Sequence, residues 1–87
     1  MAKVEKEVTI KNAQGLHARP AALFVQIAAK YDSSLTVTKG SDVVNGKSIM
    51  GVLMLGAQQN SSILLCAEGD DAQQLVDELE SFLHNNE

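Results

Sequence analysis

The chain alternates between short segments of strand character and longer apolar segments of helical character, separated mainly by glycine, asparagine and serine. Four segments have the pattern of strands: residues 4–10, 34–38, 43–45 and 62–68. Three segments are predicted to be helices: residues 18–30, 48–55 and 70–83. This order predicts an α+β fold, in which one sheet carries all the helices on one face as a two-layer sandwich.

The residues at the helix starts support these boundaries. Pro20 lies in the first turn of the first helix, where an amide hydrogen would have no intrahelical partner in any case. Ser48 is predicted to cap the second helix through its hydroxyl. Asp70 is predicted to cap the third helix, with Gln73 completing a capping box.

Size and composition exclude several classes of protein. Eighty-seven residues, 45% of them hydrophobic, predict a single domain over residues 1–87 with no room for a deep substrate cavity. A net charge of −4 and few aromatic residues argue against a nucleic-acid partner. No Cys/His cluster has metal-ligand spacing, no cofactor is expected, and the single cysteine, Cys66, is expected in the core. Without an apolar run of membrane-spanning or signal-peptide type, a cytoplasmic location is expected.

The segment from Gly15 to Pro20, Gly-Leu-His-Ala-Arg-Pro, carries the strongest functional signal. It places His17 at the start of a helix, where unpaired amides and the positive end of the dipole favour anions. Arg19 can bring a guanidinium to the same anion. Because imidazole is also a nucleophile near neutral pH, such a site can accept and hold a phosphoryl group, as a relay requires.

A purely structural role is the alternative. His17 would then only cap the helix, Arg19 would be a solvated surface charge, and Pro20 fits a helix start on either interpretation. Short motifs often match unrelated proteins, so this one alone leaves both interpretations open.

Two motifs of the chain resemble those of one family. Residues 15–21 resemble the active-site signature of HPr, the histidine-containing phosphocarrier of the bacterial phosphoenolpyruvate:sugar phosphotransferase system. Residues 44–56 resemble the serine site of the same family. Length and element order also agree from end to end, and two motifs at the family's separation are far more specific than one. The resemblance favours the functional interpretation of His17.

The resemblance implies a carrier, not an enzyme that acts on a small molecule. Phospho-enzyme I would phosphorylate His17 on Nδ1, and His17 would pass the group to an EIIA domain of a sugar permease or of a regulatory counterpart system. Arg19 would stabilise the transferred group. The family's fold is an open-faced sandwich, a four-stranded antiparallel sheet under three helices. A monomer is expected, since such a carrier docks through one face.

Ser48 has a structural and a regulatory interpretation. As an N-cap it is worth ~1 kcal/mol over alanine. By resemblance, it is the residue that an ATP-dependent enzyme, HPr kinase/phosphorylase, phosphorylates in many members of the family. A phosphate there, with about −1.5 to −2 charges, would oppose the docking of an acidic partner.

The second helix has more apolar residues than one buried face can hold, so some must point outward. The resemblance implies a docking surface for enzyme I and EIIA made of Ala18, Arg19, Pro20, Lys47, Ile49, Met50, Leu53 and Met54. The alternative is that Leu53 and Leu55 pack on the sheet and the others are ordinary surface residues.

The basic collar expected around such a site is thin. Enteric members of the family carry partner-facing lysines on the first helix, whereas this chain has only Arg19, Lys30 and Lys47 in the region. How strongly charge guides docking, and whether the downstream branch is sugar uptake or regulation, is left open.

Two other functions compete with the carrier. One is a regulatory binding module, in which phosphorylation of Ser48 controls docking. The other is a His-dependent hydrolase, which would lack a cavity, a metal and an orienting acid. The intact His17 favours the carrier, because a purely regulatory relative could lose the imidazole and keep its docking surface.

Overall fold

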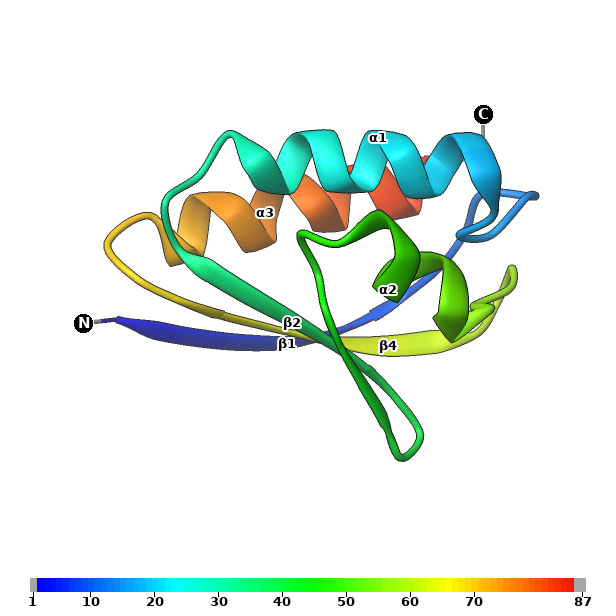
Figure 1. Cartoon of the computed structure of the whole chain (residues 1–87), viewed down its shortest axis with the longest axis horizontal. Helices are drawn as coiled ribbons and strands as arrows, with labels where there is room; N and C mark the ends of the chain where they lie inside the picture. The colour runs from blue at the N-terminus through cyan, green and yellow to red at the C-terminus, as the bar shows by residue number, and fades with distance from the viewer. Residues whose placement is uncertain (1, 86–87) are drawn as a thin grey trace.

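The computed structural model describes residues 2–85 as one sheet covered by helices (Figure 1). The strands are β1 (Lys3–Thr9), β2 (Ser34–Lys39), β3 (Asp42–Asn45) and β4 (Ser62–Glu68). The helices are α1 (Ala18–Ala29), α2 (Ile49–Leu55) and α3 (Ala72–His84). The predicted element order is confirmed, and most boundaries agree with the prediction within one residue.

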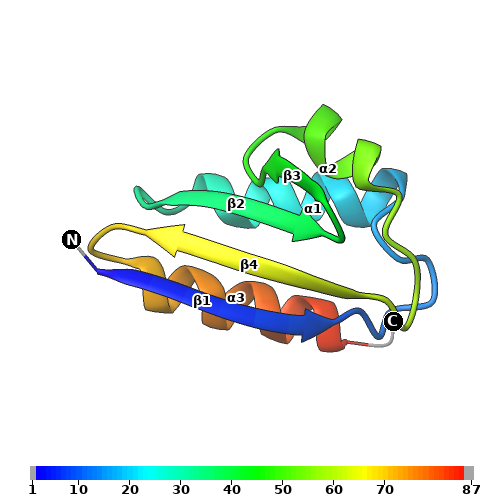
Figure 2. The ribbon, with the colours of Figure 1, turned by 90° about the horizontal axis from the view of Figure 1, so that it is seen from below.

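The four strands form one antiparallel sheet in the order β1-β4-β2-β3 (Figure 2). β4, the last strand in the sequence, therefore lies between β1 and β2. β2 and β3 form the predicted hairpin, in which Lys39 lies opposite Asp42. The shortest dimension of the molecule is 19 Å, as expected for one sheet and one helical layer packed about 10 Å apart. The predicted open-faced sandwich is confirmed.

The core lies between the sheet and the helices. Alternate residues of the strands point into it, among them Val8, Leu35, Val37, Ile63, Leu65 and Ala67. The helices supply Ala21, Phe24, Ala28, Val52, Leu55, Leu75, Val76, Leu79 and Leu83. Because strand alternation and helical periodicity both select one face, the opposite face of the sheet is left without a helical layer.

The predicted cap of α3 is wrong. The N-cap is Asp71, one residue later than expected, and its side chain makes no capping hydrogen bond. The Asp71 carboxylate instead accepts hydrogen bonds from the backbone amides of Asp32 and Ser33 and from the Ser33 hydroxyl. Gln73 forms no capping box with Asp70, since its side-chain amide donates to Asp77 at 2.8 Å. A tertiary contact has replaced the local one.

The expected core position of Cys66 is also wrong. Cys66 is only half-buried, because Leu65 and Ala67 on either side point into the core and so direct it to the open face of the sheet. No helix among residues 2–85 combines the length and the apolar content that a membrane crossing needs.

Candidate functional site

His17 is the exposed N-cap residue of α1. Its backbone is extended, with φ −92° and ψ −168°, and its side chain makes no capping hydrogen bond. The interpretation of His17 as a simple helix cap is therefore not supported. The imidazole is instead accessible at the end of the helix where backbone amides point outward.

The first turn of α1 offers two unpaired backbone amides. The first intrahelical hydrogen bond runs from the Ala21 amide to the His17 carbonyl at 2.7 Å. The amides of Ala18 and Arg19 precede it and have no intrahelical carbonyl partner. Pro20 has no amide hydrogen. An anion beside His17 can therefore receive two backbone hydrogen bonds, and the helix dipole favours its charge.

The loop before His17 is held by two contacts with the rest of the molecule. Asn12 is buried, 6% exposed, and its side-chain amide donates to the Gly15 carbonyl at 2.8 Å. The Leu16 amide donates to the Ala57 carbonyl at 2.8 Å. Gly15 has φ +63°, and a Cβ there would lie 2.5 Å from the Ala57 carbonyl oxygen. Only glycine fits this position without strain. The two contacts hold the loop against the rest of the molecule and so fix the backbone position of His17.

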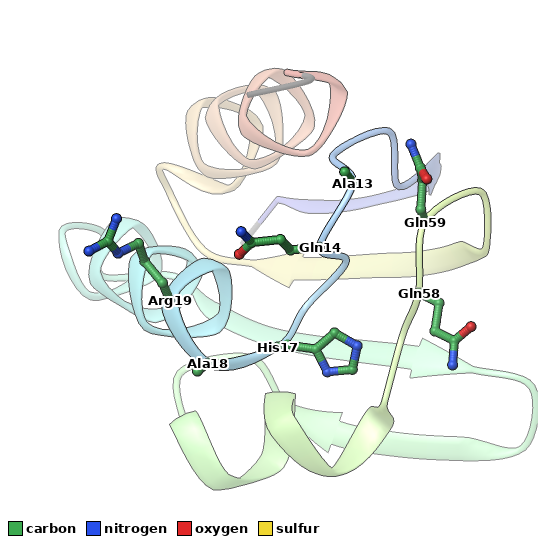
Figure 3. A pocket seen from close by; sticks show the side chains of 7 residues that line it. All are labelled: Ala13, Gln14, His17, Ala18, Arg19, Gln58 and Gln59. Atoms are coloured by element: carbon green, nitrogen blue, oxygen red, sulfur yellow. The ribbon is translucent and has the colours of Figure 1, made fainter.

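An open hollow of about 640 Å³ lies in front of His17 (Figure 3). It is lined by Ala13, Gln14, His17, Ala18, Arg19, Gln58 and Gln59. The His17 ring points into it, toward Gln58, whereas the Arg19 side chain extends to the other side of α1 (Figure 3). The structure thus places both residues on the rim of one hollow, but it does not bring the guanidinium against the imidazole.

Sequence reasoning missed the glutamines of this hollow. Gln58 and Gln59 follow α2 and reach His17 only because Ala57 pairs with Leu16. Gln14 lies within the motif region, but nothing in its local sequence indicates that it faces the site. Predicting that Gln58 and Gln59 face His17 would require knowledge of the contact between the loop at Leu16 and the loop at Ala57.

Two of the three expected collar cations lie elsewhere. The Lys30 ammonium is paired with Glu78 at 2.6 Å at the far end of α1. The Lys47 ammonium donates to the Tyr31 carbonyl at 2.6 Å. Arg19 is the only charged residue among the described residues that line the His17 hollow. The expected collar of Arg19, Lys30 and Lys47 is thus reduced to Arg19.

The apolar residues of α2 divide between core and surface. Val52 and Leu55 are buried, while Ile49, Met50, Leu53 and Met54 are 42%, 64%, 37% and 77% exposed. The alternative that Leu53 packs inward is wrong, because the helix turns Val52 and Leu55 to the sheet. Of the other expected docking residues, Ala18 is exposed, but Pro20 is buried and offers a partner little surface.

Ser48 caps α2 as predicted. Its hydroxyl oxygen accepts a hydrogen bond from the Gly51 amide at 3.1 Å. The side chain is half-buried. The structural role of Ser48 is confirmed, and its phosphorylation stays a prediction.

Comparison with known proteins identifies the family. Residues 4–85 match the family described as "PTS HPr component phosphorylation site". This chain belongs to the HPr family. The phosphocarrier protein HPr of Borreliella burgdorferi is 40% identical over 83 residues, 91% of this chain and 96% of that protein. The HPr-like protein Crh of Halalkalibacterium halodurans is 45% identical over 80 residues, 92% of this chain and 95% of that protein.

A solved structure shows the same fold. The crystal structure of the phosphocarrier protein HPr from Bacillus anthracis matches with a TM-score of 0.92 and 38% identity, covering 95% of this chain and 99% of that one. The resemblance to HPr is confirmed, and the chain is an HPr-type protein of the phosphotransferase system. Its HPr relatives have two kinds of name, phosphocarrier HPr and HPr-like Crh, so the family alone does not separate transfer from regulation.

Proposed function

We propose that this HPr-type protein carries a phosphoryl group on His17, which it accepts from phospho-enzyme I and donates to an EIIA domain. The observation that carries the proposal is the exposed imidazole, which faces an open hollow at the start of α1. A carrier needs this openness, because two different protein active sites must reach the same atom in turn.

The transfer step uses the neutral imidazole. The lone pair of Nδ1 attacks phosphorus, and the bond from phosphorus to its donor on enzyme I breaks as the new N–P bond forms. The amides of Ala18 and Arg19 then donate to the phosphoryl oxygens. The Arg19 guanidinium reaches the same oxygens by rotating its exposed side chain around α1, and each charge-assisted bond contributes about 1.5–3 kcal/mol.

The test is labelling with enzyme I and radioactive phosphoenolpyruvate. A phosphoramidate on His17 is labile in acid and stable in base, so the label should be lost on acid treatment. We expect His17→Ala to abolish this label and Ser48→Ala to retain it. Acid-labile label that persists in His17→Ala refutes the assignment of the carrier residue.

Regulation through Ser48 is the second candidate function, and the similarity to Crh favours it. HPr kinase/phosphorylase would add a phosphate to the hydroxyl that caps α2, next to the exposed Ile49, Met50 and Leu53. The added charge would weaken docking of an acidic partner on that face. ATP-dependent, acid-stable label that disappears in Ser48→Ala supports this role, and label that persists in Ser48→Ala rules it out.

The proposed partners, enzyme I and EIIA, would use the same exposed surface of the protein. Enzyme I and EIIA would dock through the exposed α2 residues together with Ala18 and Arg19, and the protein would act as a monomer in the cytoplasm. No cofactor takes part, because the phosphoryl group arrives already activated on enzyme I.

A further inference from the structure

The seven lysine and arginine residues fall into two groups. Four have partners within residues 2–85: Lys3 pairs with Glu5, Lys6 with Glu80, Lys30 with Glu78, and the Lys47 ammonium donates to the Tyr31 carbonyl. The side chains of Lys11, Arg19 and Lys39 have neither an ion pair nor a hydrogen bond within the same residues. An unpaired cation retains its full charge for a partner.

Lys39 and Lys11 lie beside the loop that faces His17, whereas Arg19 lines the His17 hollow from α1 with its side chain directed to the other side of that helix (Figure 3). Arg19 shares the His17 hollow with Gln58 and Gln59. A second hollow of about 430 Å³ has the same two glutamines on its wall, and Lys39 lines it too. The Lys11 carbonyl accepts a hydrogen bond from the Gln59 side chain at 3.2 Å, and Lys11 is exposed.

The two hollows form one continuous surface, because they share Gln58 and Gln59. No carboxylate among the described residues lines either hollow. Asp42 lies opposite Lys39 in the β2–β3 register, but the two form no ion pair, and Asp42 lines a different hollow beside Met54. The described residues that line these two hollows therefore include cations and no carboxylate, in a chain with a net charge of −4.

We infer that the docking surface of this protein extends from His17 across Gln58 and Gln59 to Lys39 and Lys11, and that it meets an acidic face on its phosphoryl donor. The inference rests on the proposed function. The electrostatic contacts with the donor are then expected beside the loop between α2 and β4. They are not expected at the far end of α1, where Glu78 neutralises Lys30. An acidic protein face fits because the rim offers separated cations and amide donors.

The experiment measures the rate at which phospho-enzyme I phosphorylates His17 as a function of carrier concentration and salt. Charges at an interface rim act mainly on association and on its salt dependence. We expect Lys39→Glu and Lys11→Glu each to raise KM about 3–10-fold with kcat unchanged, and to weaken the decrease in kcat/KM with added salt.

Lys3→Glu is the matched control. It reverses the charge of a lysine at the end of β1 farther from the His17 hollow, about 20 Å along the strand from Thr9. KM should therefore stay within about 2-fold of the unmodified protein. Circular dichroism and thermal unfolding verify that each variant is folded.

The outcomes separate this inference from the proposed function. Absence of acid-labile label on the unmodified protein overturns the carrier function itself. Normal labelling with unchanged KM in both the Lys39 and Lys11 variants overturns the docking surface alone. Equal losses in the Lys3 control also overturn it, because net charge would then explain the effect. Competition by a short DNA duplex that these variants abolish would assign the surface to nucleic acid and overturn the acidic-protein assignment.

Discussion

At the start of α1 the chain is held by backbone contacts and one buried amide, whereas at the far end of α1 it is held by charged side chains that are exposed or half-buried. The first region relies on Asn12, Gly15 and the Leu16–Ala57 hydrogen bond. The second contains the Lys30–Glu78 pair and the bonds of Asp71 to Ser33. Of the bonds at the far end, the exposed Lys30–Glu78 pair is weakened by screening in water.

This contrast explains how a small protein can expose a reactive residue without losing its position. Side-chain ties near His17 would compete with the partner, so the backbone fixes the residue and the surrounding side chains are left available. At the far end no such demand exists, and the available charges are used within the chain. The difference can be tested by breaking each region in turn.

The largest effect is expected from Gly15→Ala. The backbone at Gly15 is left-handed, which disfavours a side chain, and the new Cβ would lie 2.5 Å from the Ala57 carbonyl oxygen. We therefore expect a loss of about 2–4 kcal/mol in the free energy of unfolding. Gly40→Ala is the matched control, because Gly40 has φ +61° but open space around it, and should lose only about 1–2 kcal/mol. Urea unfolding measures both, and equal losses would show that the close approach to Ala57 is unimportant.

The next effect is expected from Asn12→Ala. This change leaves the buried Gly15 carbonyl without its side-chain donor and should lower stability by about 1–3 kcal/mol. It should also slow His17 phosphorylation, because the loop before His17 loses a tether. Gln59→Ala, which removes an exposed hydrogen bond to Lys11, is the control and should change stability by less than about 0.5 kcal/mol. An Asn12 variant as stable as the unmodified protein would contradict the role of the buried amide.

Removal of the α2 cap should have a smaller effect. Ser48→Ala deletes the bond to the Gly51 amide and should lower stability by about 1 kcal/mol while leaving the acid-labile label intact. Thermal unfolding and labelling on the same samples measure the two properties. Loss of the label at unchanged stability would mean that Ser48 acts in transfer and not only in the fold.

The smallest effect concerns the far end, and it depends on pH. The hydrogen bond from Ser33 holds the pKa of Asp71 below its ordinary 3.8, and Lys30 holds the pKa of Glu78 below its ordinary 4.5. A lowered folded pKa gives stabilisation that is present above the ordinary value and lost as pH falls through the folded one. Urea midpoints should therefore decrease slightly below about pH 4.

Asp71→Asn should reduce this acid dependence, and Asp70→Asn, the exposed neighbour, is the matched control. Both variants are compared by their urea midpoints at about pH 5 and about pH 3. An acid dependence that stays the same in Asp71→Asn would show that ionisation of Asp71 does not contribute to it.

The parts of the molecule that could be predicted from the sequence are those set by neighbouring residues. The start of α1 at His17 and the Ser48 cap depend on residues within one turn, and both predictions agree with the structure. Asp71 could not be predicted, because its partner Ser33 lies 38 residues away and competes with the helix amides for the carboxylate.

The same limit applies to the site. The position of Gln58 beside His17 depends on a loop contact that no local pattern encodes. The orientation of Arg19 is not set by packing, because the side chain is exposed and can adopt several rotamers. Residue types and spacing thus indicate the chemistry of the site, and tertiary contacts determine its rim.

The place of β4 between β1 and β2 has a consequence for synthesis on the ribosome. Lys3 pairs with Glu68, so β1 has no neighbouring strand until β4 has been translated. The β2–β3 hairpin can form early, but the sheet is incomplete until β4 pairs between β1 and β2. Pairing over such a long sequence separation makes folding slow relative to local contacts. The sheet is therefore completed in a late step, when β4 pairs with both β1 and β2.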